Sequence, residues 1–149
     1  MRGAIFNSLA SSSALEDATV WDLFAGSGAL GIEALSRGAA QAVFVDRDRR
    51  AVATIRANLD ALGLAGRGKV VCDDVPRWVR SAGHAEVVLI DPPYAFEGWA
   101  DLLDHLDAAM AVCESDRPID PAVGWAVMKV RRHGGTVVTL MQSRGVPAT

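Results

Sequence analysis

A run of four residues, Asp91-Pro92-Pro93-Tyr94, combines groups that could bind and activate an amino group on an aromatic base. Two prolines in series make a stiff loop, and because neither has an N–H, their carbonyl oxygens stay free to accept from a ligand. Asp91 adds a carboxylate acceptor, and Tyr94 offers a flat face for stacking. An exocyclic amine is a poor nucleophile, so acceptors that turn its lone pair toward a methyl donor would promote transfer by positioning and electrostatics. We therefore predict Asp91, Pro92 and Tyr94 as catalytic residues.

A glycine-rich turn, Gly26-Ser27-Gly28-Ala29-Leu30-Gly31, has the spacing GxGxxG and lies between a predicted strand and a predicted helix. Glycines permit a tight turn and a close approach of the backbone to a ligand, and a helix N-terminus offers free N–H groups. Asp46 follows Gly26 by 20 residues, where a carboxylate can accept both hydroxyls of a ribose. Taken alone, the turn fits a nicotinamide cofactor as well as S-adenosylmethionine.

Three observations favour S-adenosylmethionine. Asp22 precedes the turn, where a carboxylate could bind the amino group of a methionine moiety but would repel a pyrophosphate. Asp73 and Asp74 end the third predicted strand and suit the exocyclic amine of adenine. A chain of 149 residues leaves no room for the substrate domain that a dehydrogenase usually adds. We predict a substrate site that includes Pro93 and Phe96, and the following cofactor site: Asp22, Phe24, Gly26, Gly28, Asp46, Asp74 and Val75.

The elements that must position these residues alternate along the chain between short apolar strands and helices, a pattern typical of βαβ units. We predict strands at 19–24, 42–45, 69–72, 87–90, 109–113, 125–130 and 136–140. The connection at 133–135 is short, which forces antiparallel neighbours, because a parallel crossover needs a dozen or more residues. The predicted fold is a single-domain, Rossmann-like α/β fold with a mostly parallel seven-stranded sheet and an antiparallel final strand. A leading helix is predicted over 1–14 and the catalytic core over 15–149.

The composition, 50% hydrophobic and 22% charged, is that of one globular domain. With 15 Lys and Arg against 18 Asp and Glu, the net charge of −3 argues against coating nucleic acid by bulk charge. A nucleic-acid partner would need a local patch, for which Arg47, Arg49 and Arg50, or Arg77 and Arg80, are candidates.

Two cysteines, Cys72 and Cys113, lie in apolar runs and are predicted to be core residues, with neither a disulfide nor a metal site. No apolar run approaches the roughly 18 residues of a membrane helix, and the N-terminus lacks a signal pattern. We expect a cytoplasmic monomer.

The stretch from Asp22 to Ala39, together with Asp91-Pro-Pro-Tyr94, resembles the RsmD family of small-subunit ribosomal RNA guanine-N2 methyltransferases. The segments 2–9 and 131–140 resemble that family's first helix and closing hairpin. The resemblance implies S-adenosylmethionine at Asp22, Gly26, Gly28, Asp46 and Asp74, with Asp91 and Tyr94 at a flipped guanine. It also implies 16S ribosomal RNA or a small-subunit precursor as partner. Members of the family begin some tens of residues earlier, so we expect this chain to lack their N-terminal segment.

The first residue of the Asp91 motif also bears on which base is read. Guanine presents two adjacent donors, N1–H and the amino N–H, which match a carboxylate, whereas adenine presents a donor beside an acceptor. Asp91 thus favours guanine. Two alternatives stay open: methylation of adenine N6 in DNA or RNA by the same loop, and a truncated module that binds the cofactor without activity.

Overall fold

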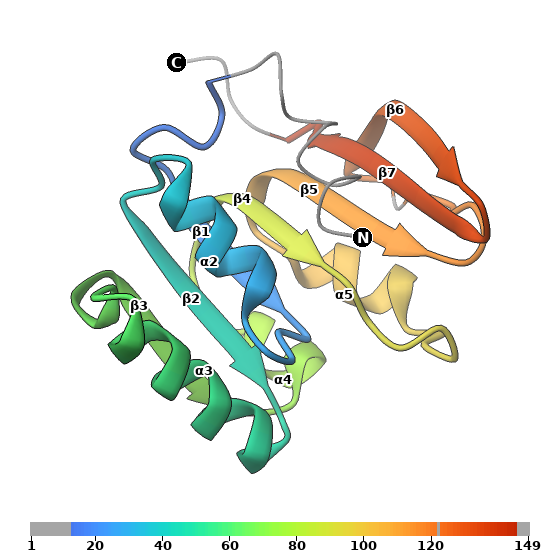
Figure 1. Cartoon of the computed structure of the whole chain (residues 1–149). Helices are drawn as coiled ribbons and strands as arrows, with labels where there is room; N and C mark the ends of the chain where they lie inside the picture. The colour runs from blue at the N-terminus through green and yellow to red at the C-terminus, as the bar shows by residue number, and fades with distance from the viewer. Residues whose placement is uncertain (1–12, 122, 146–149) are drawn as a thin grey trace.

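The computed structural model describes residues 13–121 and 123–145, within which seven strands form one sheet in the order β3-β2-β1-β4-β5-β7-β6 (Figure 1). The predicted leading helix at 1–14 lies almost wholly outside the described residues. The strands are β1 (Thr19–Leu23), β2 (Gln41–Asp46), β3 (Gly68–Cys72), β4 (Ala85–Ile90), β5 (Ala108–Ser115), β6 (Trp125–His133) and β7 (Thr136–Ser143).

The strand directions confirm the predicted fold class. The first five strands pair in parallel, with β1 between β2 and β4. Strand β7 is antiparallel to both β5 and β6, so β6 runs in the same direction as β5 and the final strand alone is reversed among the seven described. The carboxyl ends of the other six strands therefore meet at one edge of the sheet, where open α/β sheets bind ligands.

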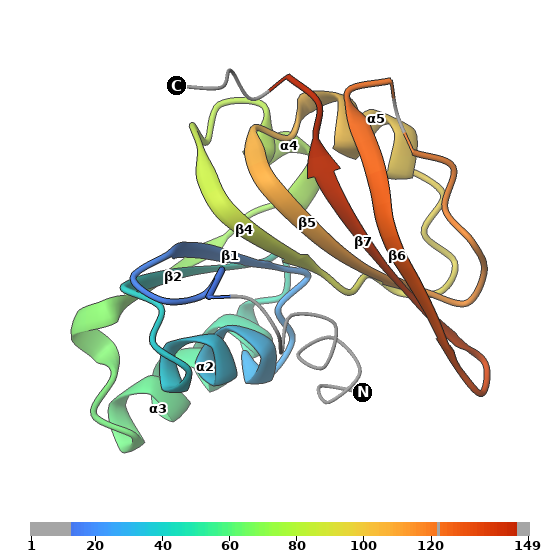
Figure 2. The ribbon, with the colours of Figure 1, turned by 90° about the horizontal axis from the view of Figure 1, so that it is seen from above.

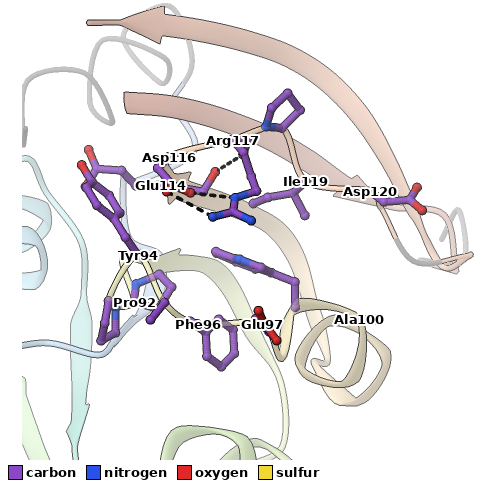
Figure 3. A pocket seen from close by; sticks show the side chains of 15 residues that line it. Pro92, Tyr94, Phe96, Glu97, Ala100, Glu114, Asp116, Arg117, Ile119 and Asp120 are labelled. Atoms are coloured by element: carbon purple, nitrogen blue, oxygen red, sulfur yellow. Dashed lines mark hydrogen bonds and ion pairs between the residues drawn. The ribbon is translucent and has the colours of Figure 1, made fainter. Parts of the chain in front are cut away.

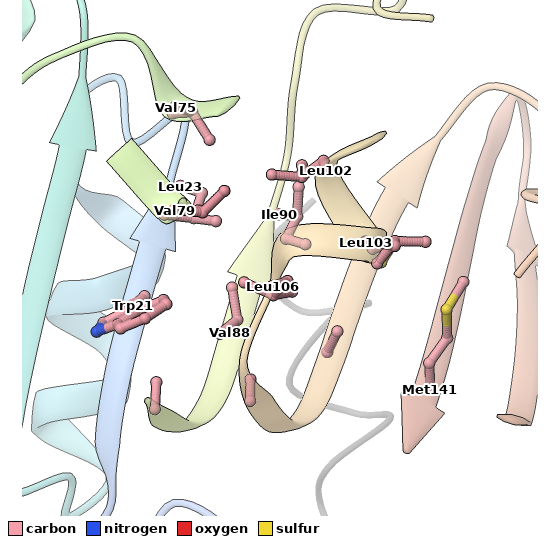
Figure 4. Packing of buried hydrophobic residues seen from close by; sticks show 14 of the residues in the cluster. Trp21, Leu23, Val75, Val79, Val88, Ile90, Leu102, Leu103, Leu106 and Met141 are labelled. Carbon is pink, nitrogen blue, oxygen red and sulfur yellow. The ribbon is translucent and has the colours of Figure 1, made fainter. Parts of the chain in front are cut away.

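Helices cover both faces of the sheet (Figure 2). Helices α2 (Ala29–Ser36) and α3 (Arg49–Ala61) lie on one face, α4 (Val75–Val79) and α5 (Trp99–His105) on the other, and a short 3-10 turn, η1 (Ala65–Arg67), precedes β3. Each face has its own hydrophobic cluster, because the central strands are apolar on both sides. The cluster under α4 and α5 includes Trp21, Leu23, Val88, Leu102 and Met141 (Figure 4).

Local sequence signals set the ends of the helices. Helix α2 ends before Gly38, whose φ of 108° is open to glycine at little cost. Helix α3 begins after Asp48, whose side chain accepts from the N–H of Arg50 at 2.9 Å, and ends before Gly63 at φ 71°. None of the helices described has the length and apolar character that crossing a membrane requires.

Some predicted boundaries were wrong. The first strand stops at Leu23 rather than at residue 24, because Phe24 turns into the left-handed region at φ 60°. Strands β5, β6 and β7 extend beyond their apolar residues, since a β-ladder needs only backbone pairing. Cys113 is buried as predicted, but Cys72 is exposed, because β3 is an edge strand of the sheet.

Candidate cofactor and catalytic site

The glycine turn joins β1 to α2 and depends on two glycines for different reasons. Gly28 has a φ of 82°, a backbone conformation that residues with a side chain rarely adopt. At Gly31 a Cβ atom would lie 2.3 Å from Cε2 of Phe44, so only glycine lets α2 pack this closely on β2. The carboxylate of Asp46 then fixes the turn, because one oxygen accepts from the N–H of Gly26 at 2.9 Å.

Asp22 supports this turn from beneath. Its Oδ2 accepts from the N–H of Gly31 at 2.9 Å, and its side chain is only 1% exposed. Burial raises the pKa of Asp22 to about 8, although the Gly31 hydrogen bond opposes the shift and the charges of Asp91 and Asp46 add to it. The carboxyl group is close to the site but is not among the residues that line its cavities, so its predicted contact with a methionine amino group stays a prediction.

A cavity of about 630 Å³ lies at the carboxyl edge of the sheet and gathers most of the predicted cofactor residues. Its volume is in the range of cofactor sites. It brings together the ends of β1, β2, β3 and β4 through eight predicted residues: Phe24, Asp46, Asp74, Val75, Asp91, Pro92, Pro93 and Phe96.

The walls of this cavity are held by their own contacts. Asp74 caps α4 and accepts from the N–H of Arg77 at 3.2 Å. The ring of Phe24 packs edge-on against Phe96, with ring centroids 5.1 Å apart. Phe24 is in a conformation that costs a non-glycine residue energy, and such positions cluster at functional sites.

A second cavity, of about 290 Å³, adjoins the first on the β5 side (Figure 3). The two share four residues in their linings: Pro92, Pro93, Ala95 and Phe96. Tyr94 and Trp99 contribute aromatic walls, and Tyr94 is 56% exposed. Its hydroxyl lies 3.3 Å from Oγ1 of Thr136, the first residue of β7, which ties the loop after β4 to the final hairpin.

Glu114, at the end of β5, is the principal site residue that the sequence reasoning missed. The register pairs Ile90 with Cys113, so Asp91 and Glu114 follow side by side on adjacent strands. A third cavity, of about 260 Å³, is lined by both carboxyl groups and by the glycine turn. The available signal was its position: Glu114 directly follows a predicted apolar strand, as Asp46 and Asp91 also do.

The environment of Glu114 makes its carboxyl group unusual. The residue is 6% exposed, and its Oε1 has no partner within the described part of the chain. Burial raises the pKa of Glu114 to about 7, helped by a hydrogen bond with Asp91 and by the charge of that group. The Glu114 carboxyl group can therefore release or accept a proton near neutral pH.

The charge of the site suits a cation. Asp46, Asp74, Asp91 and Glu114 line the adjoining cavities, and Asp22 lies directly below them. A sulfonium and an ammonium group would find acceptors here, whereas a pyrophosphate would meet several carboxylates. These residues fit S-adenosylmethionine and disfavour a dinucleotide. The sheet order, the glycine turn and this acidic edge define the class of Rossmann-like, S-adenosylmethionine-dependent methyltransferases.

Comparison with known proteins places the chain more narrowly. It belongs to the family described as Conserved hypothetical protein 95, whose model matches residues 1–142. Ribosomal RNA small subunit methyltransferase D of Escherichia coli (strain K12) is 34% identical over 154 residues, covering 95% of this chain and 76% of the relative. YlbH of Bacillus subtilis (strain 168) is 38% identical over 138 residues, covering 83% and 75%. The resemblance to the RsmD family is thereby confirmed.

Solved structures confirm the fold. A conserved hypothetical protein of Streptococcus pyogenes superposes with a TM-score of 0.85 at 33% identity, covering 97% of this chain and 96% of that protein. SMU.776, crystallised in complex with SAH, has the same fold with a TM-score of 0.74 at 16% identity, covering 93% of this chain and 48% of that protein. That likeness shows the fold alone, and S-adenosylmethionine stays the predicted cofactor, which the acidic lining of the cavities fits.

Proposed function

We propose that this chain transfers a methyl group from S-adenosylmethionine to the exocyclic N2 of a guanine in 16S ribosomal RNA. The observation that carries the proposal is the pair of carboxyl groups, Asp91 and Glu114, placed between a cofactor-sized cavity and a second, aromatic-walled cavity. Both relatives reported above are named as ribosomal RNA methyltransferases, which supports the class of substrate.

The cofactor would occupy the cavity of about 630 Å³. In this arrangement Asp46 accepts from the ribose hydroxyls and Asp74 from the adenine amine, while Phe24 and Val75 supply apolar walls. Asp46 keeps free lone pairs for this, since each of its oxygens accepts one backbone N–H, from Gly26 and from Asp48, both at 2.9 Å. The cofactor supplies an electrophilic methyl group on a sulfonium.

The acceptor base would occupy the adjoining cavity, stacked on Tyr94. A base inside a helix cannot reach the cofactor, so it must be unpaired or flipped out. Asp91 and the carbonyl of Pro92 hold the amine so that its lone pair points at the methyl carbon. Methyl transfer would join the amine nitrogen to the methyl carbon and would leave the electron pair of the carbon–sulfur bond on sulfur. The amine then loses one proton, which the pair of Asp91 and Glu114 accepts.

Guanine fits this pair of carboxyl groups better than adenine does. Guanine presents N1–H beside its amino N–H, so it offers two donors in a row. Asp91 and Glu114 lie side by side and can accept both, provided the pair carries at least one negative charge. Adenine would present its N1 lone pair to a carboxylate, which costs energy because a buried acceptor is left unpaired.

The test is mass spectrometry of 16S ribosomal RNA, naked and within a small-subunit precursor, after incubation with this protein and isotopically labelled cofactor. A labelled N2-methylguanine is the expected product, from a monomeric enzyme acting in the cytoplasm. A labelled N6-methyladenine would replace the guanine assignment with the adenine one. The absence of label from both, with the cofactor bound, would reduce the chain to a binding module.

The variant Asp91→Asn sharpens that test. Asn keeps the shape of Asp91 but removes its negative charge, so methyl transfer should fall by at least about 100-fold, as for loss of a charged catalytic group. Affinity for S-adenosylhomocysteine, measured by calorimetry, should change by less than about tenfold, because Asp46 and Asp74 remain. Exposed Asp60 on α3 provides the matched control, Asp60→Asn, which should leave both quantities unchanged. Unaltered methyl transfer by Asp91→Asn would refute the role of this carboxylate.

A further inference from the structure

The proposed RNA substrate carries a negative phosphate at every nucleotide, and the acidic site would repel it. The arginines predicted from the sequence as a local patch are poorly placed to bind these phosphates. Arg77 and Arg80 pair with Asp73 and Asp101, the latter through two hydrogen bonds of 2.9 and 3.1 Å. Arg47 lines the cofactor cavity on its β2 side, away from Tyr94 and the second cavity. Arg49 and Arg50 begin α3, which packs on β2 and β3 rather than beside β5 and the second cavity. Cations nearer the second cavity are better placed to bind the phosphates that flank the base.

The charges of the chain are divided unevenly. All 18 Asp and Glu residues precede Pro121, whereas residues 121–149 contain four Lys and Arg and no acidic residue. The C-terminal segment therefore carries a charge of +4 in a chain whose net charge is −3. Three of these four cations, Lys129, Arg131 and Arg132, lie on β6, the outer strand of the sheet.

Strand register assigns two of these cations to the face that carries the site. Side chains of residues paired across a ladder point to the same face. Val138 of β7 pairs with Glu114 on one side and Arg131 on the other, and Leu140 pairs with Lys129. Lys129, Arg131 and His133 therefore share the face of Glu114, whereas Arg132 points to the opposite face. We call Lys129, Arg131 and His133 the β6 stripe.

The β6 stripe lies close to the proposed base. Glu114 and Arg131 are separated by one intervening strand, which is about 10 Å. His133 pairs with Thr136, whose hydroxyl contacts that of Tyr94. The β6–β7 hairpin also extends well beyond the rest of the sheet, as Figure 2 shows. A nucleotide strand whose base enters beside Tyr94 would thus run its backbone along this stripe.

The cations of the stripe are available for a ligand. Arg131 and His133 are exposed and Lys129 is partly exposed. None of the three forms an ion pair within residues 13–121 and 123–145. By contrast, Arg117 in the second cavity is bound by Asp116 at 3.0 Å. Free cations beside an acidic cavity are the arrangement expected where a base is bound by carboxylates and its phosphates by cations.

We propose that the β6 stripe binds the phosphate backbone of the RNA that flanks the methylated base. The inference rests on the proposed function, because it names the surface that holds the substrate of that same site. Phosphate contacts position a nucleic acid without reading its sequence, so the stripe sets the register of the strand while Asp91 and Glu114 select the base.

The test compares two double variants of equal charge. Lys129→Gln/Arg131→Gln removes two cations of the stripe, and Arg56→Gln/Arg132→Gln removes one from α3 and one from the opposite face of β6. Binding to an unmodified 16S ribosomal RNA transcript is measured by filter retention between about 0.1 and 1 M KCl. Each lost phosphate contact lowers the slope of log affinity against log salt by about 0.7, so two contacts amount to about 25-fold at 0.1 M salt relative to 1 M.

We expect that loss for the stripe variant and a change of about twofold or less for the control variant. Equal losses in both would show that bulk charge is responsible and would overturn the proposal, as would unchanged binding by the stripe variant. Unchanged affinity for S-adenosylhomocysteine verifies that each variant is folded. A salt-independent dimer that buries β6 against a second copy, detected by sedimentation, would also overturn it.

Methyl transfer by the unsubstituted protein separates this proposal from the one on which it rests. If the protein methylates the transcript and the stripe variant binds normally, the stripe is refuted and the proposed function stands. If the protein binds the transcript through the stripe but transfers no methyl group to it, the proposed function fails and the stripe stands.

Discussion

Replacing Glu114 by Gln removes a buried carboxyl group whose ionisation lowers the free energy of unfolding. Burial raises its pKa from 4.5 to about 7, so between these pH values the native state holds a proton that the unfolded chain has released. Stability therefore falls as pH rises from 4.5 to about 7 and levels off above. A shift of about 2.5 pKa units corresponds to roughly 3 kcal/mol. Gln has a similar shape and carries no charge, so the variant should escape this loss.

The expected result is a stabilisation that depends on pH. At pH 8 the Glu114→Gln variant should exceed the parent protein by up to about 3 kcal/mol, or roughly 6–12 °C in Tm for a domain of this size. At pH 4.5 the two should melt together. Methyl transfer at pH 8 should fall in the same variant by about 100-fold, because a proton acceptor is lost. A site residue that costs stability and supports activity is the usual compromise.

Thermal melts by circular dichroism from pH 4.5 to 8, with methyl transfer to ribosomal RNA at pH 8, provide the assay. Exposed Glu16 provides the matched control, since Glu16→Gln removes a carboxylate that lines none of the three cavities described. A Tm difference that is equal at both ends of the pH range would show that Glu114 does not titrate near neutral pH. Full methyl transfer by Glu114→Gln would refute its part in the reaction, whatever the melts show.

Three further outcomes are expected. Gly31→Ala should lower the free energy of unfolding, measured by urea denaturation, by about 1–3 kcal/mol, because the new Cβ would lie 2.3 Å from the Phe44 ring. In the control Gly66→Ala the new Cβ has open space around it, so the free energy of unfolding should change by less than about 1 kcal/mol. Equal losses in the two variants would contradict the packing argument. Tyr94→Ala should weaken RNA binding by about 5–150-fold through lost stacking, while Tyr94→Phe, which loses only the hydroxyl contact with Thr136, should stay within about tenfold; equal effects would exclude stacking. Because the pKa of Asp22 is raised to about 8, binding of a cationic cofactor at pH 7 should release a proton from this carboxyl group. The release is measured by calorimetry, as a binding heat that changes with the ionisation enthalpy of the buffer. Asp22→Asn should abolish the release, and a release that persists in this variant would show that the proton comes from another group.

Sequence alone predicted the elements and many of the residues that gather around the cavity of about 630 Å³, because both depend on local rules. Apolar runs in a parallel sheet are covered on both faces, so they stand out in the sequence. Ligands of open α/β sheets collect at the carboxyl ends of strands, so acidic residues after those runs, such as Asp46 and Asp74, were placed together correctly. Sequence could not show that Asp22 faces inward under Gly31, since that depends on how α2 packs on the sheet.

Glu114 and the β6 stripe were missed because both depend on strand order and register. Nothing local indicates that β5 lies next to β4, or that the last two strands exchange places so that β7 follows β5. Only that order sets Glu114 beside Asp91 and Arg131 across one strand from Glu114. Cys72 was misjudged for the same reason, because an apolar strand at the edge of a sheet exposes side chains that a central strand would bury.

A net charge of −3 is compatible with RNA binding in this chain, because the acidic residues of the site and the cations of the β6 stripe lie apart from one another. At the effective dielectric constant of a protein surface, two unit charges about 10 Å apart interact by about 1.7 kcal/mol, and screening at physiological ionic strength reduces this to roughly 0.5 kcal/mol. Glu114 and Arg131 lie about that far apart across one strand, so the acidic site reduces phosphate binding at the stripe by about twofold per charge. A phosphate in contact with Arg131 responds mainly to that contact. One face of one sheet can therefore bind a cationic methyl donor among carboxylates and an anionic backbone two strand positions away.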